Sequence, residues 1–223
     1  MQQTRPAPQT SASPAAPASP TPESSPQNDA IDRAVSDPYT GDLSIFEDPN
    51  RERNLQINRV MDVLGIREGS SVADIGAGSG WFTVRAARRA GATGMVYAVE
   101  INREYLNHIE ERAGRENLPN IRAVLGREDD PNLPRASVDA VLILKTYHEI
   151  SEPVGVMRRL RTALRGAARV GIIDRNGDGD DHGIDRDVVV REMERAGYRL
   201  VEEHDFVKPD GMDYFLVFQP RRS

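Results

Sequence analysis

Short apolar runs rich in β-branched residues alternate along the chain with longer stretches in which apolar residues recur at helical spacing. The helical stretches are expected at about 81–90, 103–114, 152–165 and 186–196. Such alternation predicts a parallel sheet with right-handed crossover helices on both faces. The strand-like runs are SVADI (71–75), MVYAV (95–99), IRAVL (121–125), VDAVLIL (138–144) and ARVGIID (168–174).

The two ends of this region follow other patterns. Before the first strand, apolar residues recur at helical spacing from Ile57 to Leu64, and Gly65 follows where a helix would end. After the last helix, two strand-like runs, 198–206 and 212–219, are separated only by the short link of residues 207–211. So short a link requires an antiparallel hairpin.

The first 28 or so residues are almost wholly Pro, Ala, Ser, Thr and Gln, which bury too little apolar surface to offset the entropy of ordering. A chain of 223 residues with 38% hydrophobic content supports one sizeable core. We therefore expect a disordered tail at 1–30 and one folded domain at 31–223. The tail is interpreted as a solvated linker, or as a tether that followed an export signal.

Composition narrows the classes of partner. The 29 basic and 35 acidic residues give a net charge of −6, which disfavours nucleic acid as a partner. The absence of cysteine excludes disulfides, thiolate metal sites and cysteine nucleophiles. No apolar run approaches the roughly 18 residues of a membrane span, and the start MQQTRPAPQT lacks the apolar core of a signal peptide. We expect a cytoplasmic protein, or an exported one if an upstream signal is missing; the oligomeric state is left open.

The first strand ends at Asp74 and is followed by Gly76, Gly78 and Gly80. A glycine-rich turn between a strand and a helix lets a ligand approach the backbone, and the helix then offers free N–H groups. Nucleotide, flavin and sulfonium cofactors all use such turns, and a merely structural turn is the alternative. The spacing is GxGxG, and Trp81 stands where a dinucleotide fingerprint needs its third glycine, which argues against a nicotinamide cofactor.

Glu100 ends the second strand, 20 positions after Gly80. A carboxylate at this place accepts hydrogen bonds from both hydroxyls of a ribose and repels a 2′-phosphate. The alternative is a solvated strand end. The occurrence of Glu100 together with the glycine turn favours the interpretation that Glu100 binds a ligand.

The motifs VADIGAGSG, VYAVE, VDAVLIL and ARVGIID, in this order, resemble those of the class I S-adenosylmethionine-dependent methyltransferases. The resemblance covers about residues 55–219. Within this superfamily the chain is similar to the small-molecule branch that includes ubiquinone and menaquinone methyltransferases. It implies a Rossmann-like, doubly wound α/β fold with a seven-stranded sheet, mostly parallel with an antiparallel C-terminal strand. It also implies S-adenosylmethionine as cofactor.

By this resemblance, Asp74 and the glycines lie at the methionine portion of the cofactor and Glu100 at its ribose. Members usually place a carboxylate beside the adenine after the third strand; here Arg127 replaces the common Asp after Gly126, so Glu128 or Asp129 is expected there, with a solvated acidic loop as the alternative. The expected cofactor-binding residues are Asp74, Gly76, Ala77, Gly78, Gly80, Glu100, Ile101, Glu128, Asp129 and Lys145.

The residues after the fourth strand, Lys145 to Glu149, lie where ligands of open parallel sheets bind. Tyr147 and His148 are the expected catalytic residues: His148 as a general base, Tyr147 to orient a substrate or to lay its ring beside the sulfonium. The alternative is that His148 and Glu149 simply start the next helix. No Asn-Pro-Pro-Tyr segment occurs here, so methylation of DNA adenine or glutamine is not expected.

The run from Asp174 to Asp185 resembles an EF-hand loop, but position 12 is Asp185 instead of Glu and the run follows a strand instead of a helix. We expect no metal there. The family also includes magnesium-dependent catechol-type enzymes, but these draw a carboxylate from the end of strand four, where this sequence has Lys145 and Thr146, so metal dependence is not expected. Instead we expect a mobile lid with Asp174 at the ligand face, His182 near the entrance and Asp185 capping the next helix.

The segment from Phe46 to Asn54 covers the cofactor in similar enzymes; the alternative is an exposed, charged helix start.

The function expected from these motifs is transfer of a methyl group to a small-molecule acceptor. Three rivals remain open: an S-adenosylmethionine-binding module without turnover, an NAD-dependent oxidoreductase, which Trp81 and the terminal hairpin oppose, and a protein or ribosomal RNA methyltransferase, which the negative charge disfavours.

Overall fold

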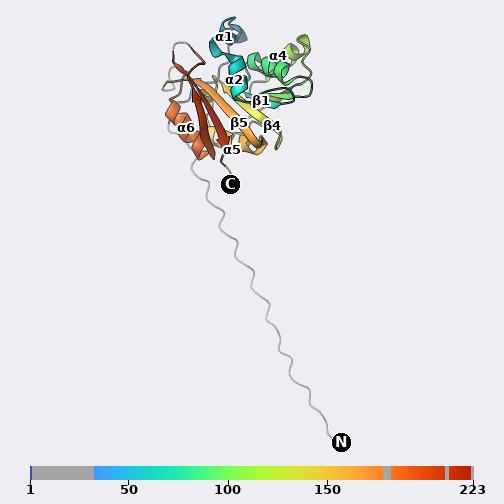
Figure 1. Ribbon diagram of the computed structural model, residues 1–223, viewed down its shortest axis with the longest axis vertical. Helices are drawn as coiled ribbons and strands as arrows, with labels where there is room; N and C mark the ends of the chain where they lie inside the picture. Colours follow the sequence, from blue (N-terminus) through green and yellow to red (C-terminus); the bar gives the residue numbers. More distant parts are fainter. Residues whose placement is uncertain (2–32, 178–181, 209–210, 222–223) are drawn as a thin grey trace.

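The computed structural model describes residues 1, 33–177, 182–208 and 211–221, so the expected tail at 1–30 lies, apart from Met1, outside the described residues. One seven-stranded sheet runs through the domain in the order β3-β2-β1-β4-β5-β7-β6 (Figure 1). The strands are β1 (Ser71–Ile75), β2 (Met95–Glu100), β3 (Ile121–Leu125), β4 (Val138–Leu144), β5 (Leu164–Arg175), β6 (Tyr198–His204) and β7 (Asp213–Pro220).

The first five strands are parallel, as the alternation of strands and helices predicts. Ile75 of β1 pairs with Val99 of β2 and Ile143 of β4, which brings the carboxyl ends of three strands to one edge of the sheet. The predicted hairpin is confirmed: β6 and β7 are antiparallel, and β7 lies between β5 and β6.

Helices cover both faces of the sheet. On one face α2 (Ile57–Val63) and α3 (Trp81–Ala90) share a core with Val72 and Leu142, and α4 (Arg103–Arg115) packs against Ala98. On the other face α5 (Pro153–Ala163) and α6 (Arg186–Arg195) share a core with Ala73 and Ile143. Neighbouring residues of a strand point to opposite faces, so each strand contributes to both cores.

The structure corrects two boundaries and adds three short elements. The helix expected to reach 165 ends at Ala163, because Leu164 already pairs with Val138 and begins β5. Gln56, whose backbone is in the left-handed conformation (φ 47°), separates α2 from the preceding helix α1 (Arg51–Leu55). Two 3-10 turns, η1 (Leu43–Glu47) and η2 (Tyr147–Glu149), were not predicted; each is too short to give a periodic signal.

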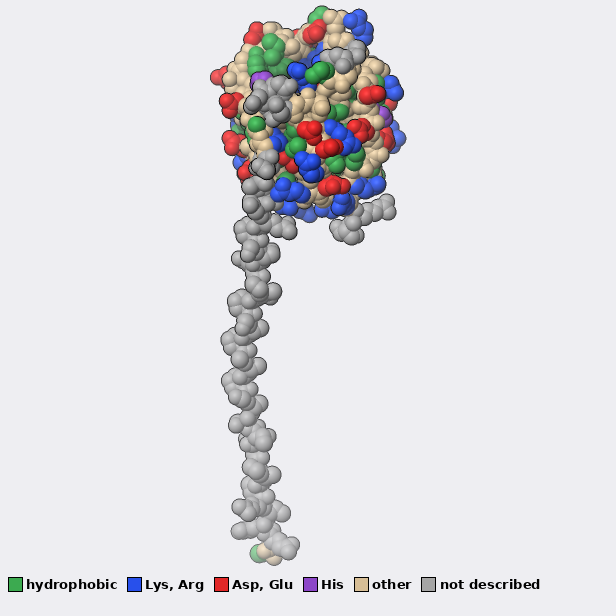
Figure 2. All heavy atoms as spheres, turned by 90° about the vertical axis from the view of Figure 1, so that its left-hand side faces the viewer, with side chains coloured by type: hydrophobic (Ala, Val, Ile, Leu, Met, Phe, Trp, Pro, Cys, Tyr) green, Lys and Arg blue, Asp and Glu red, His purple; other side chains and the backbone are tan. Residues whose placement is uncertain are grey.

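Acidic and basic side chains are interspersed on the face of the domain shown in Figure 2, and many pair between neighbouring elements. Glu203 of β6 binds Arg186 of α6, and Glu202 binds Arg169 of β5. Such exposed pairs contribute about 1 kcal/mol or less each, so the apolar cores carry the fold. In the ranges that the structure describes, no helix is both long and apolar enough to cross a membrane.

Candidate active site

A cavity of about 1010 Å³ opens at the edge where the parallel strands end. The strand ends supply one wall, and the segment before α1, from Val35 to Phe46, supplies the opposite one. Ligand pockets in proteins measure roughly 300 to 1000 Å³, so this cavity lies at the upper end of that range. The expected site residues that line it are Asp74, Gly76, Ala77, Gly78, Glu100, Ile101, Glu128, Lys145 and His148.

The glycine turn has the backbone that its sequence predicts. Gly76, Gly78 and Gly80 have φ values of 70°, 53° and 75°, in the left-handed region that favours glycine. A Cβ on Gly76 would lie 2.2 Å from Cγ2 of Thr146, so no larger residue fits there. A Cβ on Gly78 would have only the Phe46 ring within 4 Å, at 3.6 Å. Gly80 caps α3 and does not line the cavity.

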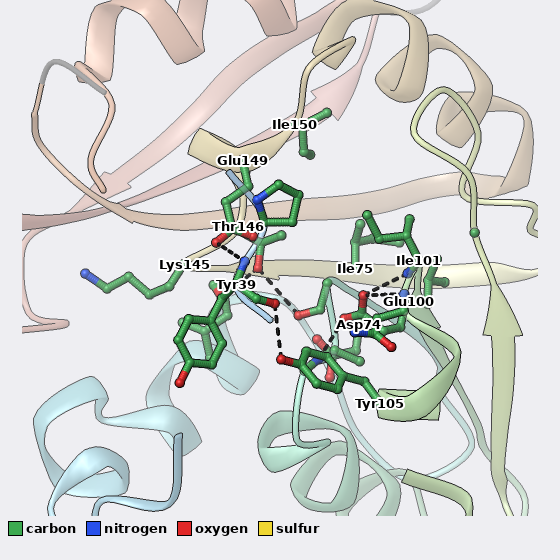
Figure 3. A pocket seen from close by; sticks show the side chains of 18 of the residues that line it. Tyr39, Asp74, Ile75, Glu100, Ile101, Tyr105, Lys145, Thr146, Glu149 and Ile150 are labelled. Carbon is green, nitrogen blue, oxygen red and sulfur yellow. Dashed lines mark hydrogen bonds between the residues drawn. The ribbon is translucent and has the colours of Figure 1, made fainter. Parts of the chain in front are cut away.

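The Glu100 carboxylate joins the glycine turn to the end of β2. Its Oε2 accepts a hydrogen bond from Gly78 N (3.0 Å), and its Oε1 accepts from Ile101 N (2.8 Å) and Asn102 N (3.1 Å). Figure 3 shows Glu100 beside Asp74 and Ile101 on one side of the pocket. Three backbone donors fix the orientation of this carboxylate, and it still lines the cavity.

Asp74, the last acidic residue of β1, is 2% exposed and accepts a hydrogen bond from Thr83 Oγ1 (2.6 Å). Burial raises the pKa of this carboxyl to about 7 and nearby Glu100 adds to the rise, against the opposing effects of the Thr83 bond and the Arg51 charge. A carboxyl with so perturbed a pKa in a cavity wall marks a functional site.

His148 forms a buried pair with Asp174. Nδ1 of His148 lies 2.9 Å from Oδ1 and 3.0 Å from Oδ2 of Asp174, and His148 N donates to Oδ2 (3.2 Å). Asp174 is fully buried behind the imidazole and does not line the cavity, in contrast to its expected place at the ligand face. Sequence analysis missed this pair. The available signal was that β4 and β5 are neighbours, which places the residues at their carboxyl ends side by side.

Glu149, the next residue, also lines the cavity. Its Oε1 accepts a hydrogen bond from Tyr39 N (3.3 Å) and lies 3.9 Å from Nε2 of His148. Burial raises the pKa of Glu149 to about 7, and the charges of Glu100 and Asp174 add to the rise, whereas the charge of His148 and the Tyr39 bond lower it.

Tyr147 and Lys145 occupy places other than those expected. The Tyr147 side chain is fully buried in the core between the sheet and α5 and does not line the cavity, so it cannot touch a ligand there. Lys145 lines the cavity with φ 57°, but its Nζ binds Asp213 Oδ1 at 2.5 Å. In Figure 3 the Lys145 side chain extends away from Glu100 and Asp74.

The two acidic residues after β3 are separated by the structure. Glu128 lines the cavity. Asp129 instead forms ion pairs with Arg159 (3.1 Å) and Arg127 (3.4 Å) and is not part of the wall. Only Glu128 is therefore placed to contact a ligand.

The segment from Arg33 to Arg51 forms a strap over the cavity. Glu47 accepts hydrogen bonds from Ser79 Oγ (2.7 Å) and Arg112 Nη1 (2.6 Å), and the Arg51 guanidinium lies 4.7 Å from the Trp81 ring centroid. Of the segment expected to cover a cofactor, Phe46 and Arg51 line the cavity. The contribution of residues 35–40 was missed, because this stretch has neither helical nor strand periodicity.

The loop after β5 is described only in part, since residues 178–181 lie outside the described residues. As expected, Asp185 caps α6 by accepting hydrogen bonds from the backbone N–H groups of Asp187 and Val188. His182 lines the cavity, with its ring centroid 6.0 Å from that of His148. Within the described part of the chain, no group of three or more His, Asp or Glu residues is arranged to hold a metal ion.

Comparison with known proteins adds to this geometry. Residues 72–167 match the family model described as "Methyltransferase domain". The nocamycin O-methyltransferase of Saccharothrix syringae is 27% identical over 114 residues, 51% of this chain and 41% of that protein. The 2-phytyl-1,4-naphtoquinone methyltransferase of Trichormus variabilis is 28% identical over 111 residues, 49% of this chain and 48% of that protein. The chain thus matches less than half the length of either relative.

The fold matches a solved structure more completely. A SAM-dependent methyltransferase from Aquifex aeolicus superimposes with a TM-score of 0.72 at 24% sequence identity. The match covers 80% of this chain and 98% of that one. The structural likeness therefore covers more of the chain than the stretch that the sequence comparisons match.

Proposed function

Because the chain belongs to the class I S-adenosylmethionine-dependent methyltransferase superfamily, we propose that it transfers a methyl group from S-adenosylmethionine to a small-molecule acceptor. The observation that carries the proposal is that three features face one cavity: the left-handed glycine turn, the Glu100 carboxylate and the His148 imidazole. A glycine turn, which has no side chains to block the backbone, next to a carboxylate suits a nucleoside that carries an amino-acid group. An imidazole in the wall of the same cavity suits removal of a proton.

The wall residues fit such a cofactor. Gly76 and Gly78 leave backbone open to the methionine portion, and the Glu100 carboxylate is placed to accept hydrogen bonds from the ribose hydroxyls. Ile101, 45% exposed in the cavity wall, offers an apolar contact for the adenine ring, with Glu128 near its amino group. When bound, S-adenosylmethionine supplies a methyl group already activated by the positive sulfonium.

His148 is the proposed general base. The Asp174 carboxylate accepts a hydrogen bond from Nδ1–H, which fixes the tautomer and leaves the lone pair of Nε2 available. Nε2 then removes the proton of the acceptor as the nucleophile is aligned with the methyl group. Tyr147 is no part of this proposal, since its side chain is buried away from the cavity.

The proposal is tested in two steps. Titration calorimetry with S-adenosylmethionine, S-adenosylhomocysteine and NAD should give saturable binding of the first two only; binding of NAD alone would reject the proposal. Label from the methyl group should then enter the low-molecular-weight fraction of a cell extract. Label in the protein or RNA fraction would point to a macromolecular acceptor, and tight binding without any transfer would point to a binding module.

A further inference from the structure

The strap over the cavity is held firmly at its two ends. At one end the Arg33 guanidinium forms an ion pair with Glu192 of α6 at 3.0 Å, and both side chains are buried. At the other end Glu47 accepts hydrogen bonds from Ser79 and Arg112. Hydrogen bonds that involve a charged group are roughly twice as strong as neutral ones. We therefore expect both ends to stay attached to the domain when the segment between them moves.

The middle of the strap, residues 37–45, has much weaker support. None of these residues, all of which the structure describes, is buried, so little apolar surface holds the segment down. It nevertheless closes one side of the cavity, since Asp37, Pro38, Thr40 and Ile45 line it. Segments with few buried apolar contacts open at a low free-energy cost. The middle of the strap is thus a cover that depends on individual hydrogen bonds.

Hydrogen bonds from two walls of the cavity meet at Tyr39. Its N–H donates to Oε1 of Glu149 (3.3 Å), in the turn after β4, and its carbonyl oxygen accepts from the hydroxyl of Tyr105 (3.2 Å) in α4. The same hydroxyl lies 3.1 Å from the carbonyl oxygen of Gly41. Figure 3 shows Glu149 and Tyr105 on opposite sides of the Tyr39 backbone. The middle of the strap is therefore attached to both walls at one residue.

The two attachments lie next to different parts of the proposed site. Tyr105 lines the cavity one helical turn after the end of β2, which carries Glu100 and Ile101. Glu149 lines it directly after His148. If the cofactor binds at the glycine turn and Glu100, as proposed above, it lies between the strand ends and the strap. The segment that covers it is then the segment that Tyr105 and Glu149 hold.

We propose that Tyr105 and Glu149 are positioning residues that hold the strap closed over the bound cofactor, and that both hydrogen bonds to Tyr39 break each time S-adenosylhomocysteine leaves. This rests on the proposed function. Neither residue takes part in the transfer of the methyl group. Because the opening of a lid and the release of product limit turnover in many enzymes, the two bonds set how long the product stays bound.

The first test removes the hydroxyl of Tyr105. Labelled S-adenosylmethionine is bound to the protein and chased with an excess of unlabelled ligand. In Tyr105→Phe the dissociation rate should rise by about three- to tenfold, as the loss of one hydrogen bond allows. Tyr97→Phe removes the hydroxyl of a β2 tyrosine that does not line the cavity, and it should release the ligand at the wild-type rate. Equal rates for Tyr105→Phe and wild type would overturn the proposal.

Two substitutions of Glu149 test the other hydrogen bond. In Glu149→Gln the amide oxygen still accepts from Tyr39 N, so the dissociation rate should stay close to that of wild type. Glu149→Leu has no acceptor and should release the ligand about three- to tenfold faster. If Glu149→Gln releases the ligand as fast as Glu149→Leu, the charge of Glu149 and not its bond to Tyr39 is responsible, and the proposal is overturned.

Hydrogen exchange separates an opened strap from a destabilised protein. In Tyr105→Phe and Glu149→Leu the amides of residues 35–46 should exchange faster than in wild type, while those of β1 and β4 keep their wild-type rates. Faster exchange throughout the sheet would show that these variants unfold more readily as a whole, and it would overturn the proposal.

Failure of this inference is distinguishable from failure of the proposed function. Wild-type protein that binds S-adenosylmethionine but releases it at the same rate as Tyr105→Phe overturns the role of the strap alone. Protein that does not bind S-adenosylmethionine overturns both.

Discussion

The imidazole of His148 and the carboxylate of Asp174 meet at 2.9 Å although 26 positions separate them in the chain. The contact exists because β4 and β5 are parallel neighbours, so that the loop after one and the last residues of the other share an edge of the sheet. Both side chains are buried, and His148 lines the cavity whereas Asp174 does not. The contact at Nδ1 therefore orients the imidazole, which agrees with the proposed role of Nε2 as a base.

Asp174→Asn and His148→Gln should each lower kcat by about 10²- to 10⁴-fold, the usual contribution of a positioned general base. Because neither change touches the glycine turn or Glu100, the Kd for S-adenosylhomocysteine should change by less than about threefold. Stopped assays of methyl transfer and calorimetry measure the two quantities. His108→Ala, which removes a histidine of α4 that does not line the cavity, is the control and should retain most activity. Full turnover in Asp174→Asn would refute the role of the pair.

Two alanine substitutions in the glycine turn should have different effects. In Gly76→Ala the new methyl group would lie within 2.2 Å of Thr146 Cγ2, so the protein should be destabilised by several kcal/mol or fail to fold. In Gly78→Ala the new methyl group would make ordinary contact with the Phe46 ring at 3.6 Å, so the substitution costs only the left-handed backbone conformation, about 1 kcal/mol, but it narrows the proposed cofactor site. It should fold and bind S-adenosylhomocysteine more weakly. Denaturant unfolding and calorimetry separate the two effects.

A second substitution, made at Thr146, tests whether contact with the Thr146 side chain causes the loss of stability in Gly76→Ala. Thr146→Gly removes the atoms that meet the new methyl group, so it should recover much of the stability lost in Gly76→Ala. If the double variant is as unstable as Gly76→Ala alone, backbone strain and not the Thr146 contact explains the loss.

Much of the fold, and the part of the cavity wall around the glycine turn, followed from local sequence patterns. The strands from Ser71 to Leu144 and the terminal hairpin were predicted to within a residue or two, because apolar periodicity and short links constrain them directly. Gly76 and Glu100 were predictable for a related reason: each needs a particular residue type at a particular strand end.

The contacts around His148 could not be predicted in the same way. The partnership of His148 with Asp174 depends on which strands are neighbours, and the burial of Tyr147 depends on which way a three-residue turn faces. Likewise Tyr39 reaches Glu149 only through tertiary folding of a segment that has no periodic pattern. These contacts are long-range, and a single sequence carries no local signal for them.

Glu100→Gln should weaken cofactor binding. The ionised carboxylate accepts three backbone hydrogen bonds and still faces the cavity, whereas an amide offers a single acceptor oxygen. Loss of charge-assisted hydrogen bonds to the ribose should raise the Kd for S-adenosylhomocysteine by about ten- to hundredfold. Glu104→Gln, an exposed acid in the first turn of α4, is the control and should bind normally. Equal affinities for Glu100→Gln and wild type would remove Glu100 from the site.

Asp74 makes stability depend on pH. Its pKa is raised by burial to about 7, whereas in the unfolded chain it ionises near 4. Between these values the folded state keeps a proton that the unfolded state has lost, so this group lowers the free energy of unfolding as pH rises from about 4 to 7 and has no further effect above. Asp74→Asn does not ionise, so the ligand-free variant should become more stable relative to wild type by several kcal/mol over this range.

Urea unfolding of the ligand-free proteins at pH 4, 6 and 8 measures this difference. Asp187→Asn, at an exposed carboxyl in the first turn of α6, serves as the control and should show a much smaller change relative to wild type. A stability difference between Asp74→Asn and wild type that is the same at all three pH values would contradict the raised pKa.

Arg33 connects the strap to the loop that carries His148. Its guanidinium pairs with Glu192 of α6 at 3.0 Å, with side chains only 7% and 5% exposed, and donates to the backbone carbonyls of Tyr147, His148 and Ile150. Arg33→Met should destabilise the protein by about 3 to 5 kcal/mol, because it leaves the Glu192 charge buried without a partner. Arg33→Met combined with Glu192→Met should recover a large part of this loss, since both charges are then gone.

Arg33→Lys separates charge from geometry. An ammonium keeps the pairing with Glu192 but lacks the planar fork that reaches several carbonyls at once. This variant should therefore be nearly as stable as wild type in urea unfolding while kcat falls several-fold, because the 147–150 loop loses donors that hold His148 in place. A fall in stability with unchanged kcat would show instead that Arg33 only ties the strap to α6. Removal of residues 2–32, which keeps Arg33, is the control and should leave kcat unchanged.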